Sequence, residues 1–130
     1  MKLLLDTCAI IFFVENTGDL SATATDAIQT PDSEVFVSAV SIGEVACAVE
    51  RGKLKMNRHW RLWWKETLRR NGWPCLPVTA EIVEEAYSLS GPLHRDPADR
   101  ILIATARVEH LTLVTTDGKI LNYPHVSTLR

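Results

Sequence analysis

The chain has 130 residues, which is enough for one domain with its own hydrophobic core but not comfortably for two. Apolar residues make up 46% and charged residues 23% of the sequence, a composition that excludes a disordered, collagen-like or coiled-coil chain. The formal net charge is only −2, so any contact with nucleic acid must come from a local basic patch.

Short apolar runs alternate with stretches of helical periodicity along the chain. The predicted elements are, in order, a strand at 2–5, a helix at 9–15, a helix at 21–30, a strand at 35–40, a helix at 41–50, a helix at 58–70, a strand at 75–78, a helix at 79–89, a helix at 96–109, a strand at 111–115, a turn at 116–119 and an edge strand at 126–129. Ser41 and Glu44 form a capping-box pattern at the start of the third helix. Strands that alternate with helices predict an α/β fold, a single domain over 1–130 with a central, mostly parallel sheet flanked by helices.

Three cysteines and an apolar start to the chain bear on its compartment. Cys8, Cys47 and Cys75 are an odd, widely spaced set, which argues against a disulfide framework, so we expect reduced thiols buried as small hydrophobic groups. The first residues resemble a secretory signal, but Asp6 interrupts them, and no apolar run approaches the ~18 residues that a membrane span needs. We therefore expect a cytoplasmic protein that keeps its N-terminus and has no membrane segment.

Acidic residues from four separate segments are predicted to meet at one edge of the sheet, where the strands end and the following helices begin. These acids are Asp6 after the first strand, Glu44 in the first turn of the next helix, Asp96 and Asp99 in the first turn of a later helix, and Asp117 after the fourth strand. Each has a structural alternative as a helix cap, a partner of a helix dipole or a turn residue, and for Asp96 the cap is the stronger interpretation. Clustered carboxylates repel unless a cation fills the centre, and an all-oxygen ligand set favours Mg²⁺, with Mn²⁺ as a substitute. Such an ion stabilises charge on a phosphoryl oxygen, so a phosphodiester is the natural substrate.

Four segments in matching order carry a resemblance to a known family. They are 3–7 (Leu-Leu-Leu-Asp-Thr), 37–44 (Val-Ser-Ala-Val-Ser-Ile-Gly-Glu), 94–106 (His-Arg-Asp-Pro-Ala-Asp-Arg-Ile-Leu-Ile-Ala-Thr-Ala) and 113–117 (Leu-Val-Thr-Thr-Asp). In these segments the chain resembles PIN-domain ribonucleases, and within that fold the VapC-type toxins of bacterial type II toxin–antitoxin systems. The resemblance covers essentially the whole chain, and the third segment is the most specific.

The resemblance implies a Mg²⁺-dependent endoribonuclease that cleaves RNA with a metal-activated water. The catalytic quartet that it implies is Asp6, Glu44, Asp99 and Asp117, with Asp6 and Asp99 holding the metal most directly. Asp96 stays open as the alternative third acid, and the accessory candidates are Asp96, Thr7, Thr115 and Arg95. The threonines would hydrogen-bond the carboxylates or a phosphate, or only satisfy backbone groups. The resemblance also implies a cognate antitoxin that covers the acidic site, a homodimer, and a hetero-oligomer with that antitoxin.

The segment 51–70 holds eight basic residues against Glu66 alone, a local charge of +7 in a chain of net −2. One interpretation is an amphipathic helix with tryptophans in the core and a solvated basic face. The other is a basic wall for the RNA backbone, with exposed tryptophan that stacks on bases or meets the antitoxin. The contact candidates are Arg58, Arg61, Trp63, Trp64, Lys65 and Arg69. Three tryptophans within five residues exceed what one core stripe needs, so we expect at least one to meet the antitoxin.

Two other functions fit parts of the pattern. A catalytically silent PIN-fold binding module is one, although such a module is free to lose its acids. An Asp- and Mg²⁺-dependent phosphotransfer enzyme is the other, but a dehalogenase-like site wants a second Asp where Cys8 stands, and the strand at 35–40 offers no phosphoacceptor Asp.

Overall fold

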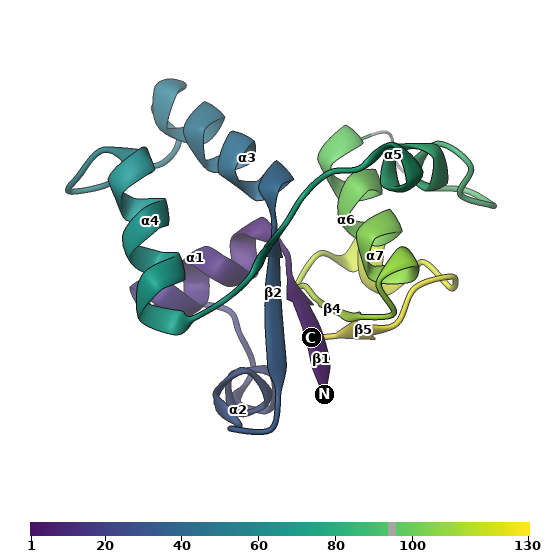
Figure 1. The fold of residues 1–130 in the computed structure, drawn as a ribbon, viewed down its shortest axis with the longest axis horizontal. Helices are drawn as coiled ribbons and strands as arrows, with labels where there is room; N and C mark the ends of the chain where they lie inside the picture. The colour runs from purple at the N-terminus through teal and green to yellow at the C-terminus, as the bar shows by residue number, and fades with distance from the viewer. Residues whose placement is uncertain (94–95) are drawn as a thin grey trace.

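The computed structural model, which describes residues 1–93 and 96–130, has one parallel sheet with helices on both faces (Figure 1). The elements are β1 (Lys2–Leu5), α1 (Thr7–Glu15), α2 (Ala22–Gln29), β2 (Glu34–Ser38), α3 (Ala39–Glu50), α4 (Trp60–Asn71), β3 (Cys75–Leu76), α5 (Ala80–Ala86), α6 (Pro97–Val108), β4 (Thr112–Val114), α7 (Gly118–Leu121) and β5 (Thr128–Leu129). The predicted α/β class and parallel sheet are confirmed.

The strand order β3-β2-β1-β4-β5 places β1 at the centre of the sheet. Leu4 of β1 is in register with Phe36 of β2 on one side and with Leu113 of β4 on the other. The chain first builds outward from β1 through β2 to β3, and then returns to build β4 and β5 on the opposite side. Ligands in open parallel sheets bind where the strand order reverses, beyond the carboxyl ends of the strands, and here that point lies between β1 and β4.

Alternating side chains of β1 supply the cores on the two faces of the sheet. Leu3 and Leu5 pack with the core that α1, α2, α3 and α4 cover, whereas Leu4 packs with the core that α6 and α7 cover. All three leucines are fully buried. Figure 1 shows the same division, with α1 to α4 on one side of β1 and β2 and α5 to α7 on the other. A strand buried on both faces explains why its sequence is continuously apolar rather than alternating.

The start of α3 differs from the prediction. Ser38 rather than Ser41 is the N-cap, and its side-chain oxygen accepts a hydrogen bond from Val40 N at 3.1 Å. The capping-box prediction for Ser41 and Glu44 is therefore wrong, and the strand ends two residues earlier than expected. As a result Ser41 is a buried helix residue, and Glu44 lies in the second turn rather than the first.

Other element boundaries also differ from the prediction. Capping side chains set several helix ends, and sequence periodicity alone cannot locate these caps. His59 caps α4 through Nδ1, which accepts from Arg61 N at 3.1 Å, so Arg58 lies before the helix instead of within it. The predicted turn at 116–119 is the start of the short helix α7, with Asp117 as its cap. The helix α5 ends at Ala86, and the strands β3, β4 and β5 are shorter than predicted.

The cysteine prediction is wrong in one respect. Cys8, Cys47 and Cys75 are free thiols, as expected, but all three are exposed rather than buried. Across the described residues, no helix is both long enough and apolar enough to cross a membrane.

Candidate active site

Four of the predicted acids line one cavity of about 340 Å³ beyond the ends of β1 and β4. They are Asp6, Glu44, Asp99 and Asp117. Two follow neighbouring strands directly, and the other two project from α3 and α6. The structure thus brings together acids that are up to 111 residues apart in the sequence, and their catalytic role stays a prediction.

Asp6 is held in place by the start of α1. It is only 7% exposed, and its Oδ1 accepts a hydrogen bond from Ala9 N at 2.8 Å, so it caps this helix. The buried Thr115 hydroxyl is hydrogen-bonded to the Asp6 carboxyl and accepts from Asp117 N at 3.0 Å. Thr115 therefore links the two acids that follow β1 and β4. Burial raises the pKa of Asp6, and the negative charge of Asp117 raises it further, while the hydrogen bonds from Thr115 and Ala9 lower it.

Glu44 reaches the cavity from α3 and is half-buried. Its Oε1 is hydrogen-bonded to the Thr7 hydroxyl, and that hydroxyl also lies 2.8 Å from the hydroxyl of Ser41. Burial raises the pKa of Glu44, the hydrogen bond from Thr7 lowers it, and the charges of Asp96 and Asp6 raise it. The structure thus places Thr7 against a carboxylate of the cavity.

The two acids at the start of α6 occupy different places. Asp96 is the N-cap, with its Oδ1 accepting from Asp99 N at 3.1 Å, and it lines a larger, more apolar cavity between α3, α5 and α6 beside Tyr87. Asp99 instead lines the acidic cavity. Burial raises the pKa of Asp99 to about 7, and the charges of Asp96, Asp117, Glu44 and Asp6 contribute in that order. The geometry favours Asp99 over Asp96 as the third acid of the cavity.

The acids also act together on a neighbouring thiol. Cys8 lines the same cavity. The residue is exposed overall, but the cavity partly desolvates its thiol, and this desolvation and the negative charges of Asp6, Glu44, Asp99 and Asp117 raise its pKa to about 11. One cavity therefore concentrates a negative field that a bound cation would neutralise.

The donor set fits a hard divalent cation, although the side chains do not close around one point. Within residues 1–93 and 96–130, no three His, Cys, Asp or Glu side chains are arranged closely enough to hold a metal ion. All four acids of the cavity nevertheless offer oxygen ligands, which Mg²⁺ and Mn²⁺ prefer. Mg²⁺ usually keeps several waters and takes only one or two carboxylates directly, so these four acids would not all need to close around it.

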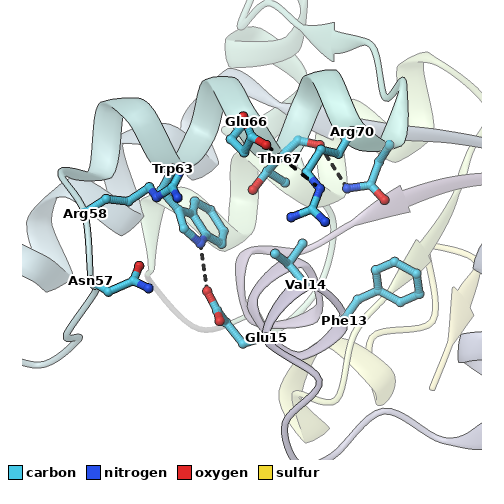
Figure 2. Close-up of a pocket in the computed structure, with 10 residues that line it drawn as sticks. Phe13, Val14, Glu15, Asn57, Arg58, Trp63, Glu66, Thr67 and Arg70 are labelled. Atoms are coloured by element: carbon cyan, nitrogen blue, oxygen red, sulfur yellow. Dashed lines mark hydrogen bonds and ion pairs between the residues drawn. The ribbon is translucent and has the colours of Figure 1, made fainter.

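Two of the three tryptophans of α4 are core residues, and Trp60 is half-buried. Trp63 and Trp64 are 5% and 3% exposed and belong to the core beneath α1 and α4. Trp63 Nε1 donates to Glu15 Oε1 at 2.8 Å across a pocket of about 490 Å³ between the two helices (Figure 2). The prediction that Trp63 and Trp64 present contact surfaces to RNA or an antitoxin is wrong, because both rings are buried in the core that α4 shares with α1 and α3.

The basic side chains predicted to form a wall are exposed. They are Arg58, Arg61, Lys65 and Arg69. The Arg61 guanidinium stacks 5.3 Å from the centroid of the Trp60 ring, and Arg69 forms an ion pair with Glu66 at 2.9 Å. Arg58 lines the pocket shown in Figure 2. Arg95, another accessory candidate, lies outside the described residues.

Sequence reasoning missed two polar residues at the cavity. Thr116 lines it beside Asp117, and Ser41 lies beneath Thr7. Ser41 was assigned to a capping box because serine three residues before glutamate is the usual signal for one. Only the packing of α1 against α3 shows that its hydroxyl faces another helix.

Comparison with known proteins identifies the family. A family model for the PIN domain matches residues 3–126. The chain belongs to the PIN domain family. It is 29% identical over 125 residues to a protein named Ribonuclease VapC22 from Mycobacterium tuberculosis, a match that covers 94% of this chain and 92% of that protein.

Solved structures share this PIN fold over nearly their whole length. The crystal structure of VapBC2 from Rickettsia felis bound to a promoter DNA fragment gives a TM-score of 0.74 at 18% identity, covering 99% of this chain and 98% of that one. A toxin–antitoxin complex from Klebsiella pneumoniae gives 0.66 at 17% identity, covering 98% and 96%. FitAcB from Neisseria gonorrhoeae gives 0.65 at 19% identity, again covering 98% and 96%. At these identities the likeness shows the fold.

Proposed function

We propose that this PIN-domain protein is a Mg²⁺-dependent endoribonuclease that acts in the cytoplasm as the toxin of a type II toxin–antitoxin module. The observation that carries the proposal is the cavity at the strand-order reversal, which Asp6, Glu44, Asp99 and Asp117 line together. The similarity to a protein named as a VapC ribonuclease supports the reaction, and the toxin–antitoxin complexes among the similar structures support the biological role.

In this proposal the carboxylates divide the work of hydrolysis. Asp6 and Asp99 would hold the cation, because hydrogen bonds fix Asp6 and because a cation would relieve the repulsion between Asp99 and its four neighbouring carboxylates. When bound, Mg²⁺ makes a coordinated water acidic and offsets the charge that develops on the phosphoryl oxygen. Glu44 would accept the proton of the attacking water, Asp117 would help to orient that water in line with the leaving oxygen, and the leaving oxygen would take a proton from solvent. No side chain forms a covalent bond with the RNA.

The proposed macromolecular partners are an RNA substrate and a cognate antitoxin that covers the acidic cavity. The exposed cations of α4 supply a positive surface in a chain of net −2, as binding to a phosphate backbone requires. We also propose that the toxin is a homodimer that forms a hetero-oligomer with its antitoxin. Light scattering on the purified chain, alone and in complex, tests both states.

The decisive experiment for the activity maps the 5′ ends of cellular RNA after brief induction of the wild type and of Asp6→Asn. Asparagine offers a side-chain amide oxygen in place of the carboxylate oxygen that accepts from Ala9 N, so this variant should keep the cap of α1 and fold while losing the carboxylate. New ends at a few defined positions in the wild type alone, with growth arrest, are the expected result. Arrest or cleavage that persists in a folded, equally expressed Asp6→Asn protein would contradict the catalytic role.

Calorimetry with Mg²⁺ separates the alternatives if no new ends appear. If the wild-type protein binds Mg²⁺ more tightly than Asp99→Asn does, the proposed metal site stands. The absence of new 5′ ends then means that the host lacks the target RNA. A wild type that binds no better than Asp99→Asn contradicts the metal site and favours the silent binding module.

A further inference from the structure

We propose that Ser41 is a positioning residue that orients the Glu44 carboxylate through the Thr7 hydroxyl. The inference deepens the proposed nuclease function and rests on it. We call these three side chains the relay: Thr7 is the first residue of α1, and Ser41 and Glu44 lie in the first two turns of α3. Neither Ser41 nor its link to Thr7 follows from the sequence pattern, which favoured a cap at this position.

The contacts fix the direction of the relay. The Thr7 hydroxyl contacts both the Ser41 hydroxyl, at 2.8 Å, and Glu44 Oε1. A hydroxyl carries a single proton, and an ionised carboxylate only accepts. Thr7 therefore donates to Glu44, and Ser41 donates to Thr7. Both hydroxyls therefore donate in the direction of the cavity, and the final acceptor is the Glu44 carboxylate.

The use of the Ser41 hydroxyl differs from that of other buried hydroxyls on helices. A serine or threonine inside a helix commonly donates to the carbonyl four residues earlier. Thr105 in α6 does this, donating to Ile101 O at 2.6 Å, and Ser38 caps α3 by accepting from Val40 N. Ser41 is fully buried yet directs its hydroxyl to a side chain of another helix. Alanine is the better helix former, so Ser41→Ala is not expected to destabilise α3 through helix propensity.

The relay matters because Glu44 has a flexible side chain and only part of it is buried. A glutamate has several rotamers, and a catalytic group loses efficiency when it is displaced by a fraction of an ångström. Thr7 restricts the carboxylate, and Ser41 in turn restricts the Thr7 rotamer. The analogous outer contacts of metal sites change affinity or activity by about 10- to 100-fold when they are removed.

The test is a double-mutant cycle of Ser41→Ala and Thr7→Val. Cleavage is measured at saturating Mg²⁺ on a synthetic RNA oligonucleotide that spans the strongest induced 5′ end, and Mg²⁺ affinity is measured separately by calorimetry. Ser41→Ala is expected to lower the cleavage rate by about 10-fold in the wild type but by less than about 2-fold in the Thr7→Val background. Thr7→Ser, which keeps the hydroxyl, should restore most of the activity that Thr7→Val loses. Mg²⁺ affinity should stay close to that of the wild type in all three variants, because Asp6 and Asp99 rather than Glu44 hold the cation in the proposed function.

Ser38→Ala is the matched control, because it removes a buried hydroxyl three residues earlier, at the N-cap of the same helix, without touching Glu44. It should lower stability through the lost cap but leave cleavage and Mg²⁺ affinity unchanged. The relay is overturned if Ser41→Ala matches the wild type, if its full effect persists in Thr7→Val, or if Ser38→Ala is equally defective. If Ser41→Ala fails to fold, the test uses Thr7 instead. Equal cleavage activity of Thr7→Val and Thr7→Ser would then overturn the relay. A wild type without cleavage or Mg²⁺ binding instead contradicts the proposed function, and the relay with it.

Discussion

Replacing Asp99 by Asn is expected to stabilise the metal-free protein at neutral and alkaline pH. The Asp99 side chain lies in the acidic cavity, where burial and four neighbouring carboxylates oppose its ionisation. Asparagine has nearly the same shape and carries no charge. The substitution therefore removes the repulsion, while the contacts that depend on shape remain.

The magnitude follows from the pKa of Asp99, which is raised from 3.8 to about 7. A change of this size corresponds to about 4 kcal/mol between the protonated and ionised forms in the absence of screening. Asp99 is partly exposed, so solvent screens the repulsion and reduces the expected effect to about 1–2 kcal/mol.

The sign of the pH dependence follows from proton binding. Between pH 4 and 7 the folded protein keeps the Asp99 proton while the unfolded chain has largely released it. Because the folded state binds more protons, the free energy of unfolding falls as pH rises through this window, and the loss is complete above about pH 7. The free energy of unfolding of Asp99→Asn does not fall in this way, so the amount by which it exceeds that of the wild type should grow from pH 5 to pH 8.

The assay is urea unfolding in EDTA at pH 5 and pH 8 for the wild type, Asp99→Asn and the control Asp26→Asn. Asp26 is an exposed acid on α2, remote from the cavity. Mg²⁺ added at pH 8 should stabilise the wild type, since it binds the folded state, and should stabilise Asp99→Asn much less. Identical pH dependence of the wild type and Asp99→Asn, or equal stabilisation of both by Mg²⁺, would refute the electrostatic reasoning.

Three further predictions concern single side chains. Asp96→Asn preserves the N-cap of α6 and should retain growth arrest, whereas Asp99→Asn should abolish it; the reverse order would exchange their roles. Trp63→Phe removes the hydrogen bond to Glu15 and should lower the free energy of unfolding by about 1–3 kcal/mol in urea titrations, beyond the effect of ring size. Trp64→Phe should cost less, because among the described residues Trp64 Nε1 is buried without a hydrogen-bond partner; an equal or larger loss would contradict this.

The sequence determined the architecture because the relevant signals are local. Continuous apolar residues at 2–5 predict a doubly buried strand, and Asp96-Pro97 predicts a helix start, whatever the rest of the chain does. Once strands and helices alternate, the parallel sheet and its site-bearing edge follow from connection rules. The gathering of Asp6, Glu44, Asp99 and Asp117 at that edge could therefore be anticipated from their positions at element ends.

Only the tertiary structure decided how individual side chains are used, because that depends on which helices pack together. Ser41 and Glu44 matched a capping box in sequence, but Ser38 takes the cap, and the packing of α1 beside α3 turns Ser41 toward Thr7. Asp99 rather than Asp96 lines the acidic cavity, since the Asp96 carboxylate turns back to cap α6 by accepting a hydrogen bond from Asp99 N.

The tryptophans of α4 are a second case in which the sequence pattern alone does not decide how side chains are used. A basic segment rich in tryptophan is compatible with a binding surface or with an amphipathic core helix, and both predict the same periodicity. The packing of α4 onto the core that it shares with α1 and α3 buries Trp63 and Trp64 and leaves the cations exposed. Periodicity records which residues share a helix face, whereas burial depends on what lies opposite that face, and a local pattern carries no information about a neighbour 48 residues away such as Glu15.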